Sequence, residues 1–126
     1  MDREKYELEF IVNTSTTILY KCLATPSGLS EWFADNVNIK GDEYTFFWDG
    51  SEETATLVKS KKGEYVRFQW EDDEGEDVYF QLGIRVDPLT NQVALIITDF
   101  AESDEVEDAK LLWENSVQKM RQSIGC

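Results

Sequence analysis

The sequence predicts an α+β fold in which one long C-terminal helix covers the apolar face of a curved antiparallel sheet of about seven strands. Three observations support this prediction. Short segments with apolar residues at every second position follow one another between residues 37 and 98, separated by hairpin turns. Two short helical segments follow the first strand. Segment 106–124 carries its apolar residues at helical spacing instead.

Length and composition are typical of a single domain, expected over residues 1–126. The chain is 41% hydrophobic and 13% aromatic, and a chain of this size buries about two-thirds of its surface on folding. A hydrophobic core is therefore expected without help from a metal or disulfides. Two cysteines are too few for a disulfide framework. We expect Cys22 to be a small buried residue and Cys126 a frayed terminal one.

Charge excludes several classes of function. The chain has 26 acidic and 12 basic residues, a net charge of −14, and no histidine. Such a surface repels phosphate backbones, so no nucleic-acid partner is expected. The absence of histidine excludes histidine-based catalysis and histidine-ligated metals. Because no apolar signal segment and no membrane span are present, we expect a cytoplasmic protein.

The N-terminal third is expected to form one strand and two short helices. Apolar side chains alternate with charged ones over 6–12, which is typical of a half-buried strand. A helix over 18–23 follows. A second helix begins at Thr25-Pro26, with Thr as its cap and Pro at its first position, and is expected to end near 35–36. Three residues are candidates to cap the first helix, namely Asn13, Thr14 and Ser15.

The remainder is expected to form six strands and the long helix. Asp49-Gly50 and Lys61-Lys62-Gly63 are hairpin signals. The apolar stripe of 106–124 includes Trp113, leaves Leu111 on the opposite side, and is preceded by the candidate caps Ser103 and Asp104. The expected strands are 37–39, 44–48, 54–58, 66–70, 78–86 and 93–98.

The stretch from Ala24 to Phe33, ATPSGLSEWF, resembles the signature of the START-like superfamily, and most of all its branch of Hsp90 ATPase activator homologues. Trp113 resembles a tryptophan of that family's last helix, although Ser103-Asp104-Glu105 stands where the family usually has a glycine-rich turn. The resemblance implies a helix-grip fold with a cavity between sheet and helix. It also implies a lipid, sterol, polyketide or hormone ligand, or a protein partner, and transfers no catalytic residue.

Ten large apolar residues are candidates for ligand binding, because ligand pockets are mostly apolar. The alternative is that they only fill the core beneath the helix. Their size argues against a very large lipid. The candidates are Trp32, Phe33, Phe46, Trp48, Phe68, Trp70, Phe80, Leu82, Trp113 and Val117.

The charged residues that stand out in the sequence are expected to have structural roles. Segment 71–77 carries six carboxylates, but its spacing does not fit a Ca²⁺ loop, so a solvated hairpin without metal is expected. Arg67 and Arg85 should point outward toward cross-strand partners. Asp99 is the one carboxylate flanked by a strongly apolar strand, and is expected to end that strand. No catalytic residue or cofactor is expected.

Two functions remain open. The first is non-catalytic binding of a small apolar molecule between the sheet and the C-terminal helix. The alternative is a co-chaperone-like interaction module whose acidic surface attracts a basic protein, although solubility alone also explains the charge. An enzyme, such as a cyclase, ranks last because no catalytic set is recognisable. We expect a monomer or weak dimer, with Leu111 and Tyr79 as candidate contacts.

Overall fold

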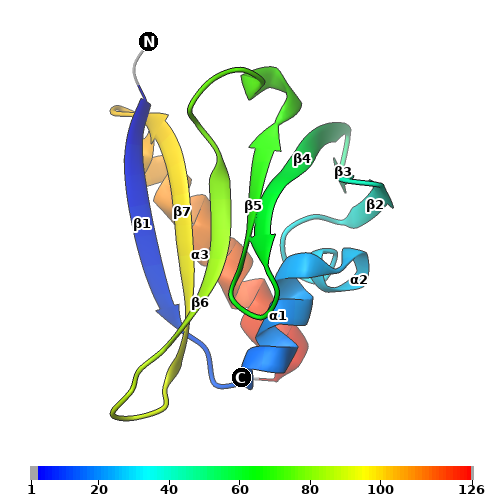
Figure 1. Cartoon of the computed structure of the whole chain (residues 1–126). Helices are drawn as coiled ribbons and strands as arrows, with labels where there is room; N and C mark the ends of the chain where they lie inside the picture. Colours follow the sequence, from blue (N-terminus) through cyan, green and yellow to red (C-terminus); the bar gives the residue numbers. More distant parts are fainter. Residues whose placement is uncertain (1–2, 126) are drawn as a thin grey trace.

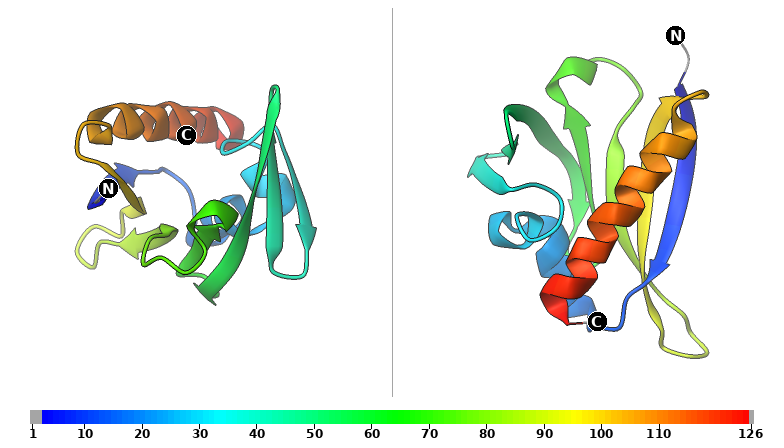
Figure 2. Two further views of the ribbon diagram at one scale, coloured as in Figure 1. Left: turned by 90° about the horizontal axis from the view of Figure 1, so that it is seen from above. Right: turned by 180° about the vertical axis from the view of Figure 1, so that it is seen from behind.

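A computed structural model describes residues 3–125 and shows a seven-stranded antiparallel sheet that curves around a long helix (Figures 1 and 2). The predicted fold class is confirmed. Cys126 lies outside the described residues, so its expected fraying is not addressed. The elements are β1 (Arg3–Ile11), α1 (Thr16–Ala24), α2 (Pro26–Leu29), β2 (Asn36–Lys40), β3 (Glu43–Trp48), β4 (Ser51–Lys61), β5 (Tyr65–Trp70), a 3-10 turn η1 (Glu71–Asp73), β6 (Phe80–Val86), β7 (Val93–Glu102) and α3 (Val106–Ile124).

The sheet has the strand order β1-β7-β6-β5-β4-β3-β2. Strands β2 to β7 therefore form a meander of hairpins, while the first strand pairs with the last. In that β1–β7 pair, Tyr6 lies opposite Asp99 and Leu8 opposite Ile97. Seen from above, the strands bend round α3 (Figure 2). The concave face and the buried stripe of α3 enclose the core, which includes Phe46, Phe68, Phe80, Leu82 and Val117.

The two short helices begin as predicted, but the second ends early. Ser15 caps α1 by accepting a hydrogen bond from the Ile18 N–H, and Thr25 caps α2 in the same way through Gly28. We expected α2 to reach residues 35–36, and this expectation was wrong because α2 ends at Leu29. Trp32 is buried and donates its indole N–H to the Cys22 carbonyl at 2.8 Å, which ties the chain to α1.

Two strand ends also differ from the predictions. Strand β6 begins at Phe80 rather than Val78, because the Gln69 side-chain amide donates to the Glu76 and Val78 carbonyls. Strand β7 runs on to Glu102. Asp99 therefore does not end its strand but lies within it.

Helix α3 has the predicted bounds, but the residue that caps its N-terminus differs from the prediction. Its N-cap is Glu105, which makes no side-chain capping bond, rather than Ser103 or Asp104. Gly125, with φ of 75°, ends the helix in the left-handed conformation that glycine favours. Leu111 is exposed, as predicted, and so is Leu112. Within residues 3–125, neither α3 nor any other helix combines the length and apolarity that a membrane crossing needs.

Candidate functional site

A cavity of about 800 Å³ lies between α3, the turn formed by residues 30–35 and the inner face of the sheet. This volume is within the range of small-molecule sites, roughly 300–1,000 Å³. Its lining comprises Ser30, Glu31, Trp32, Phe33, Ala34 and Asp35 from the turn, Trp48, Glu53, Trp70, Phe80 and Asp99 from the sheet, and Ala109, Leu112, Trp113, Asn115, Ser116 and Lys119 from α3.

The ten candidate residues divide into two groups. Six line the cavity: Trp32, Phe33, Trp48, Trp70, Phe80 and Trp113. The other four are fully buried behind the cavity wall, where their side chains fill the core: Phe46, Phe68, Leu82 and Val117. Of the ten candidates, six therefore line the cavity and four only fill the core.

Phe33 is the centre of the aromatic wall. Its ring is nearly parallel to those of Phe80 and Trp113, with centroids 5.4 and 5.6 Å away. It meets the ring of Trp48 edge-on at 5.8 Å. Aromatic pairs of this kind contribute about 0.5–1.5 kcal/mol beyond simple burial. Phe33 therefore joins the turn, the sheet and α3 in one aromatic cluster.

Two indole hydrogen bonds hold the turn in place. The Trp32 N–H donates to the Cys22 carbonyl in α1 at 2.8 Å. The Trp48 N–H donates from β3 to the Phe33 carbonyl at 3.0 Å. The two central residues of the turn are therefore fixed, one to a helix and the other to the sheet, so the aromatic wall is formed before any ligand arrives.

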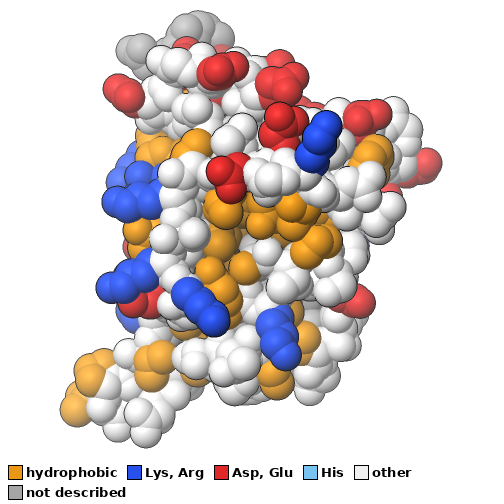
Figure 3. Space-filling view, turned by 45° about the vertical axis from the view of Figure 1, so that its right-hand side comes forward, with side chains coloured by type: hydrophobic (Ala, Val, Ile, Leu, Met, Phe, Trp, Pro, Cys, Tyr) orange, Lys and Arg blue, Asp and Glu red, His pale blue; other side chains and the backbone are white. Residues whose placement is uncertain are grey.

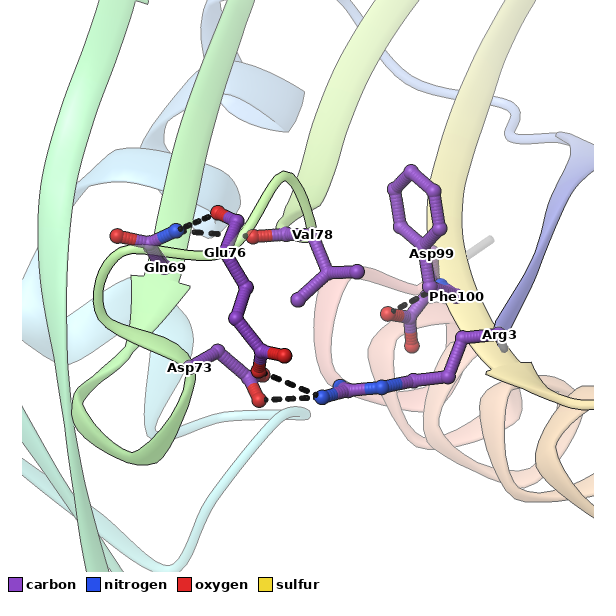
Figure 4. A network of polar contacts seen from close by, with 7 residues as sticks. All are labelled: Arg3, Gln69, Asp73, Glu76, Val78, Asp99 and Phe100. Carbon is purple, nitrogen blue, oxygen red and sulfur yellow. Dashed lines mark hydrogen bonds and ion pairs between the residues drawn. The ribbon is translucent and has the colours of Figure 1, made fainter. Parts of the chain in front are cut away.

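Asp99 is the polar centre of the inner face. Its Oδ2 accepts hydrogen bonds from the Trp113 indole N–H at 3.0 Å and the Tyr6 hydroxyl at 3.3 Å. Its Oδ1 accepts the Phe100 backbone N–H at 2.8 Å, a contact drawn in Figure 4. Three donors from β1, β7 and α3 thus orient one carboxylate at the cavity wall.

Burial raises the pKa of Asp99 above its usual value of 3.8, and the three hydrogen bonds only partly oppose this. The nearby Asp73 carboxylate raises it further. The pKa of Tyr6 is also raised, first by burial and then by the negative charge of Asp99. The folded protein therefore binds the Asp99 proton more tightly than the unfolded chain does.

Replacing Asp99 by Asn is expected to stabilise the protein progressively more as the pH rises. A raised folded-state pKa gives stability that is fully present below the unfolded value, about 3.9, and is lost as the pH climbs through the folded value. Asparagine cannot ionise, so the variant does not lose this stability as the pH rises. Chemical unfolding of both proteins between pH 4 and 8 measures the difference, with exposed Asp42→Asn as the charge control. A difference independent of pH would show that Asp99 has no raised pKa.

The acidic segment 71–77 joins β5 to β6 and is exposed at every residue except Asp73, as expected of a solvated hairpin, but an arginine holds part of it. Arg3, at the start of β1, reaches Asp73 at 2.7 Å and Glu76 at 3.2 Å (Figure 4). Strands β7 and β6 lie between β1 and β5 in the sheet. The Arg3 side chain therefore ties together two parts of the sheet that are not neighbours.

The outer face agrees with the predictions for the arginines. Arg67 donates to the Gln81 side chain and lies over the Tyr79 ring, 4.0 Å from its centroid. Arg85 lies within 4.0 Å of Glu7 and Glu9. In the face shown in Figure 3, acidic side chains crowd the upper part and basic ones lie mainly toward the left and below. The exposed ion pairs of Arg85 contribute little to the stability of the fold.

The sequence interpretation missed most of the polar lining. One signal was available for Glu53, because the two-residue turn at Asp49-Gly50 sets the register that places Glu53 opposite Phe46. Asp35, Asn115, Ser116 and Lys119 carried no comparable signal. Their places depend on the irregular turn after α2 and on the rotation of α3 about its axis.

Comparison with known proteins places this geometry in a family. The model of the START-like superfamily domain matches residues 1–126. No curated protein is significantly similar in sequence. A solution structure of a Bacteroides fragilis protein is 38% identical to the chain, covers 98% of it and 93% of its own length, and has a TM-score of 0.69.

Two more distant structures share the fold. The Aha1 dimer from Colwellia psychrerythraea is 15% identical, with 95% of each chain covered and a TM-score of 0.79. A Bacillus halodurans protein is 18% identical, with 97% of this chain and 98% of that chain covered and a TM-score of 0.75. With the match along the whole length and the helix-grip architecture, these findings show that the chain belongs to the START-like superfamily.

Proposed function

We propose that the protein binds a small, largely apolar molecule in the cavity between α3 and the sheet, without catalysing a reaction. The observation that carries this proposal is the aromatic wall: six large rings border a space of about 800 Å³, with Trp32, Phe80 and Trp113 mostly buried within the wall. Four more large apolar residues close the core behind them, which limits the ligand to the size of this space.

The geometry favours binding because the wall is already formed. The turn that carries Phe33 is held by the indole hydrogen bonds of Trp32 and Trp48. A ligand entering such a site loses its own freedom but does not have to order the protein. Polar groups at the edge, such as Asn115 and Ser116, are available to orient the ligand.

Two neighbouring leucines on α3 provide a matched test. Both are exposed, but Leu112 lines the cavity and Leu111 does not. A panel of apolar compounds is first screened by thermal unfolding, where a ligand at 100 times its Kd stabilises by about 2.7 kcal/mol. Leu112→Ala is then expected to weaken the best ligand about fivefold, or roughly 1 kcal/mol, and Leu111→Ala to leave it unchanged.

Calorimetric titration of the two variants measures these affinities. Equal losses in both variants would place the ligand elsewhere on α3. If native mass spectrometry finds no bound molecule and no compound stabilises the protein, the small-molecule function is wrong.

The net charge of −14 supports a second candidate, an interaction module for a basic protein. A neighbour in structure, Aha1, is an Hsp90 ATPase activator homologue. Binding of this kind is distinguished from cavity binding by two properties: it weakens with salt, and Leu112→Ala leaves it unaffected.

A further inference from the structure

We propose that the cavity selects organic cations, molecules with an aromatic or aliphatic body and an ammonium group that is held beside Asp99. This inference rests on the proposed binding function and specifies its ligand class. Three features of the described residues support it: the charge of the lining, the position of Asp99 and the nature of the rings.

The cavity lining is strongly acidic. Among the lining residues that the structure describes, four are carboxylates and Lys119 is the only base. Glu31 and Asp35 come from the turn, Glu53 from β4 and Asp99 from β7. Because the whole chain also carries a net charge of −14, the field at the mouth attracts cations and repels anions.

Asp99 lies where a ligand's charge would meet the rings. It faces Tyr6 across the β1–β7 pair, and the β6–β7 register, in which Gln81 pairs with Thr98, brings it beside Phe80. Among residues 3–125, no Lys or Arg side chain forms an ion pair with it. Its negative charge is therefore held by neutral donors alone.

The hydrogen bonds of Asp99 leave capacity for a ligand. A carboxylate has about four acceptor sites, and three are used by Tyr6, Trp113 and Phe100. Oδ1 keeps one site beyond the Phe100 N–H. An ammonium group could donate to this oxygen while the neutral donors keep the carboxylate in place.

The rings around this point add to the attraction. Trp113 both donates to Asp99 and lies against Phe33 and Trp32, at centroid distances of 5.6 and 6.3 Å. Asp99 lies at the N–H edge of Trp113, so an ammonium group at Asp99 would be held by the carboxylate, while the ring faces of the wall pack against the body of the ligand.

Other ligand classes fit this site less well. An anionic lipid would bring its carboxylate next to Asp99 and Glu53, with Lys119 as the only compensating charge. A neutral molecule would use the rings, but a hydroxyl could give the remaining acceptor of Asp99 only an uncharged hydrogen bond, which is weaker than the charge-assisted bond of an ammonium group. Charge complementarity thus favours a cation over both.

Three probes with the same naphthyl body and different charges test the inference. They are 2-(2-naphthyl)ethylamine, protonated at pH 7, the neutral 2-(2-naphthyl)ethanol, and the anion 2-naphthylacetate. Calorimetric titration is expected to show the amine binding about tenfold more tightly than the alcohol, and the acetate more weakly than both. Raising the salt concentration should weaken only the amine.

Variants assign the selectivity to Asp99. Asp99→Asn is expected to reduce amine affinity about tenfold while leaving alcohol affinity within about twofold. Glu53→Gln, at an exposed lining residue, should reduce amine affinity about threefold, and provides a test that leaves the hydrogen bonds of Asp99 untouched. Glu114→Gln removes one charge from α3 outside the lining and should change neither affinity.

The outcomes separate this inference from the function on which it rests. If the alcohol binds as tightly as the amine, or the acetate binds best, the cavity is a binding site but the cation selectivity is wrong. The same conclusion follows if Asp99→Asn and Glu53→Gln both leave the amine unaffected. If none of the three probes binds and the wider apolar panel also fails, both proposals are overturned.

Discussion

Gly28→Ala is expected to destabilise the protein by about 3 kcal/mol or more, because the new methyl group has no space. A Cβ at Gly28 would lie 1.9 Å from the Lys21 carbonyl oxygen, 2.6 Å from its carbonyl carbon and 2.8 Å from the Cys22 Cα. All three atoms belong to the backbone of α1, so no side chain can move aside. The two helices would have to separate.

Separating the helices would also damage the cavity. Cys22 supplies the carbonyl that holds the Trp32 indole, and Trp32 leads directly into Phe33. Urea unfolding at equilibrium measures the loss of stability, with Ser27→Ala, an exposed neighbour in α2, as the control that should change by no more than about 0.5 kcal/mol. Equal midpoints for the two variants would mean that α1 and α2 are not in such close contact.

Phe46→Ala is expected to cost about 3–5 kcal/mol, the usual range for removing a large buried ring. The side chain is fully buried. Its ring meets Phe33, Trp70 and Phe68 at centroid distances of 4.9, 5.7 and 6.0 Å. Removing it would leave a void directly behind the aromatic wall.

The adjacent residue provides the control for this variant. Phe47 points to the opposite face of β3 and is only partly buried, so Phe47→Ala should cost less than half as much. Denaturant unfolding with a shared m-value compares the two. If they lose the same stability, Phe46 is not at the centre of the core.

Local patterns predicted most of the fold. Alternation and hairpin turns were sufficient for the meander from β2 to β7, and the apolar stripe predicted the bounds of α3. The end of α2 was mispredicted because Leu29, Trp32 and Phe33 have helical spacing, whereas the indole bond from Trp32 to α1 holds residues 30–35 as a turn. A contact between elements overrode the local preference there.

The candidate site was predictable only in part. Alternation places Phe46 and Trp48 on the same face of β3, but only Trp48 reaches the cavity. Depth beneath a helix depends on sheet curvature and helix position, which periodicity does not encode. Asp99 was recognisable as an unusual carboxylate, but its partners Tyr6 and Trp113 are 93 and 14 residues away in the chain.

The chain's tryptophans give the cavity its own spectroscopic signal. All four of them, Trp32, Trp48, Trp70 and Trp113, lie on its lining. Indole emission and the tryptophan bands of the near-ultraviolet circular dichroism therefore come from the wall of this one space. A molecule that enters it changes the surroundings of these fluorophores directly, so occupancy can be followed in unlabelled protein, on the timescale of mixing.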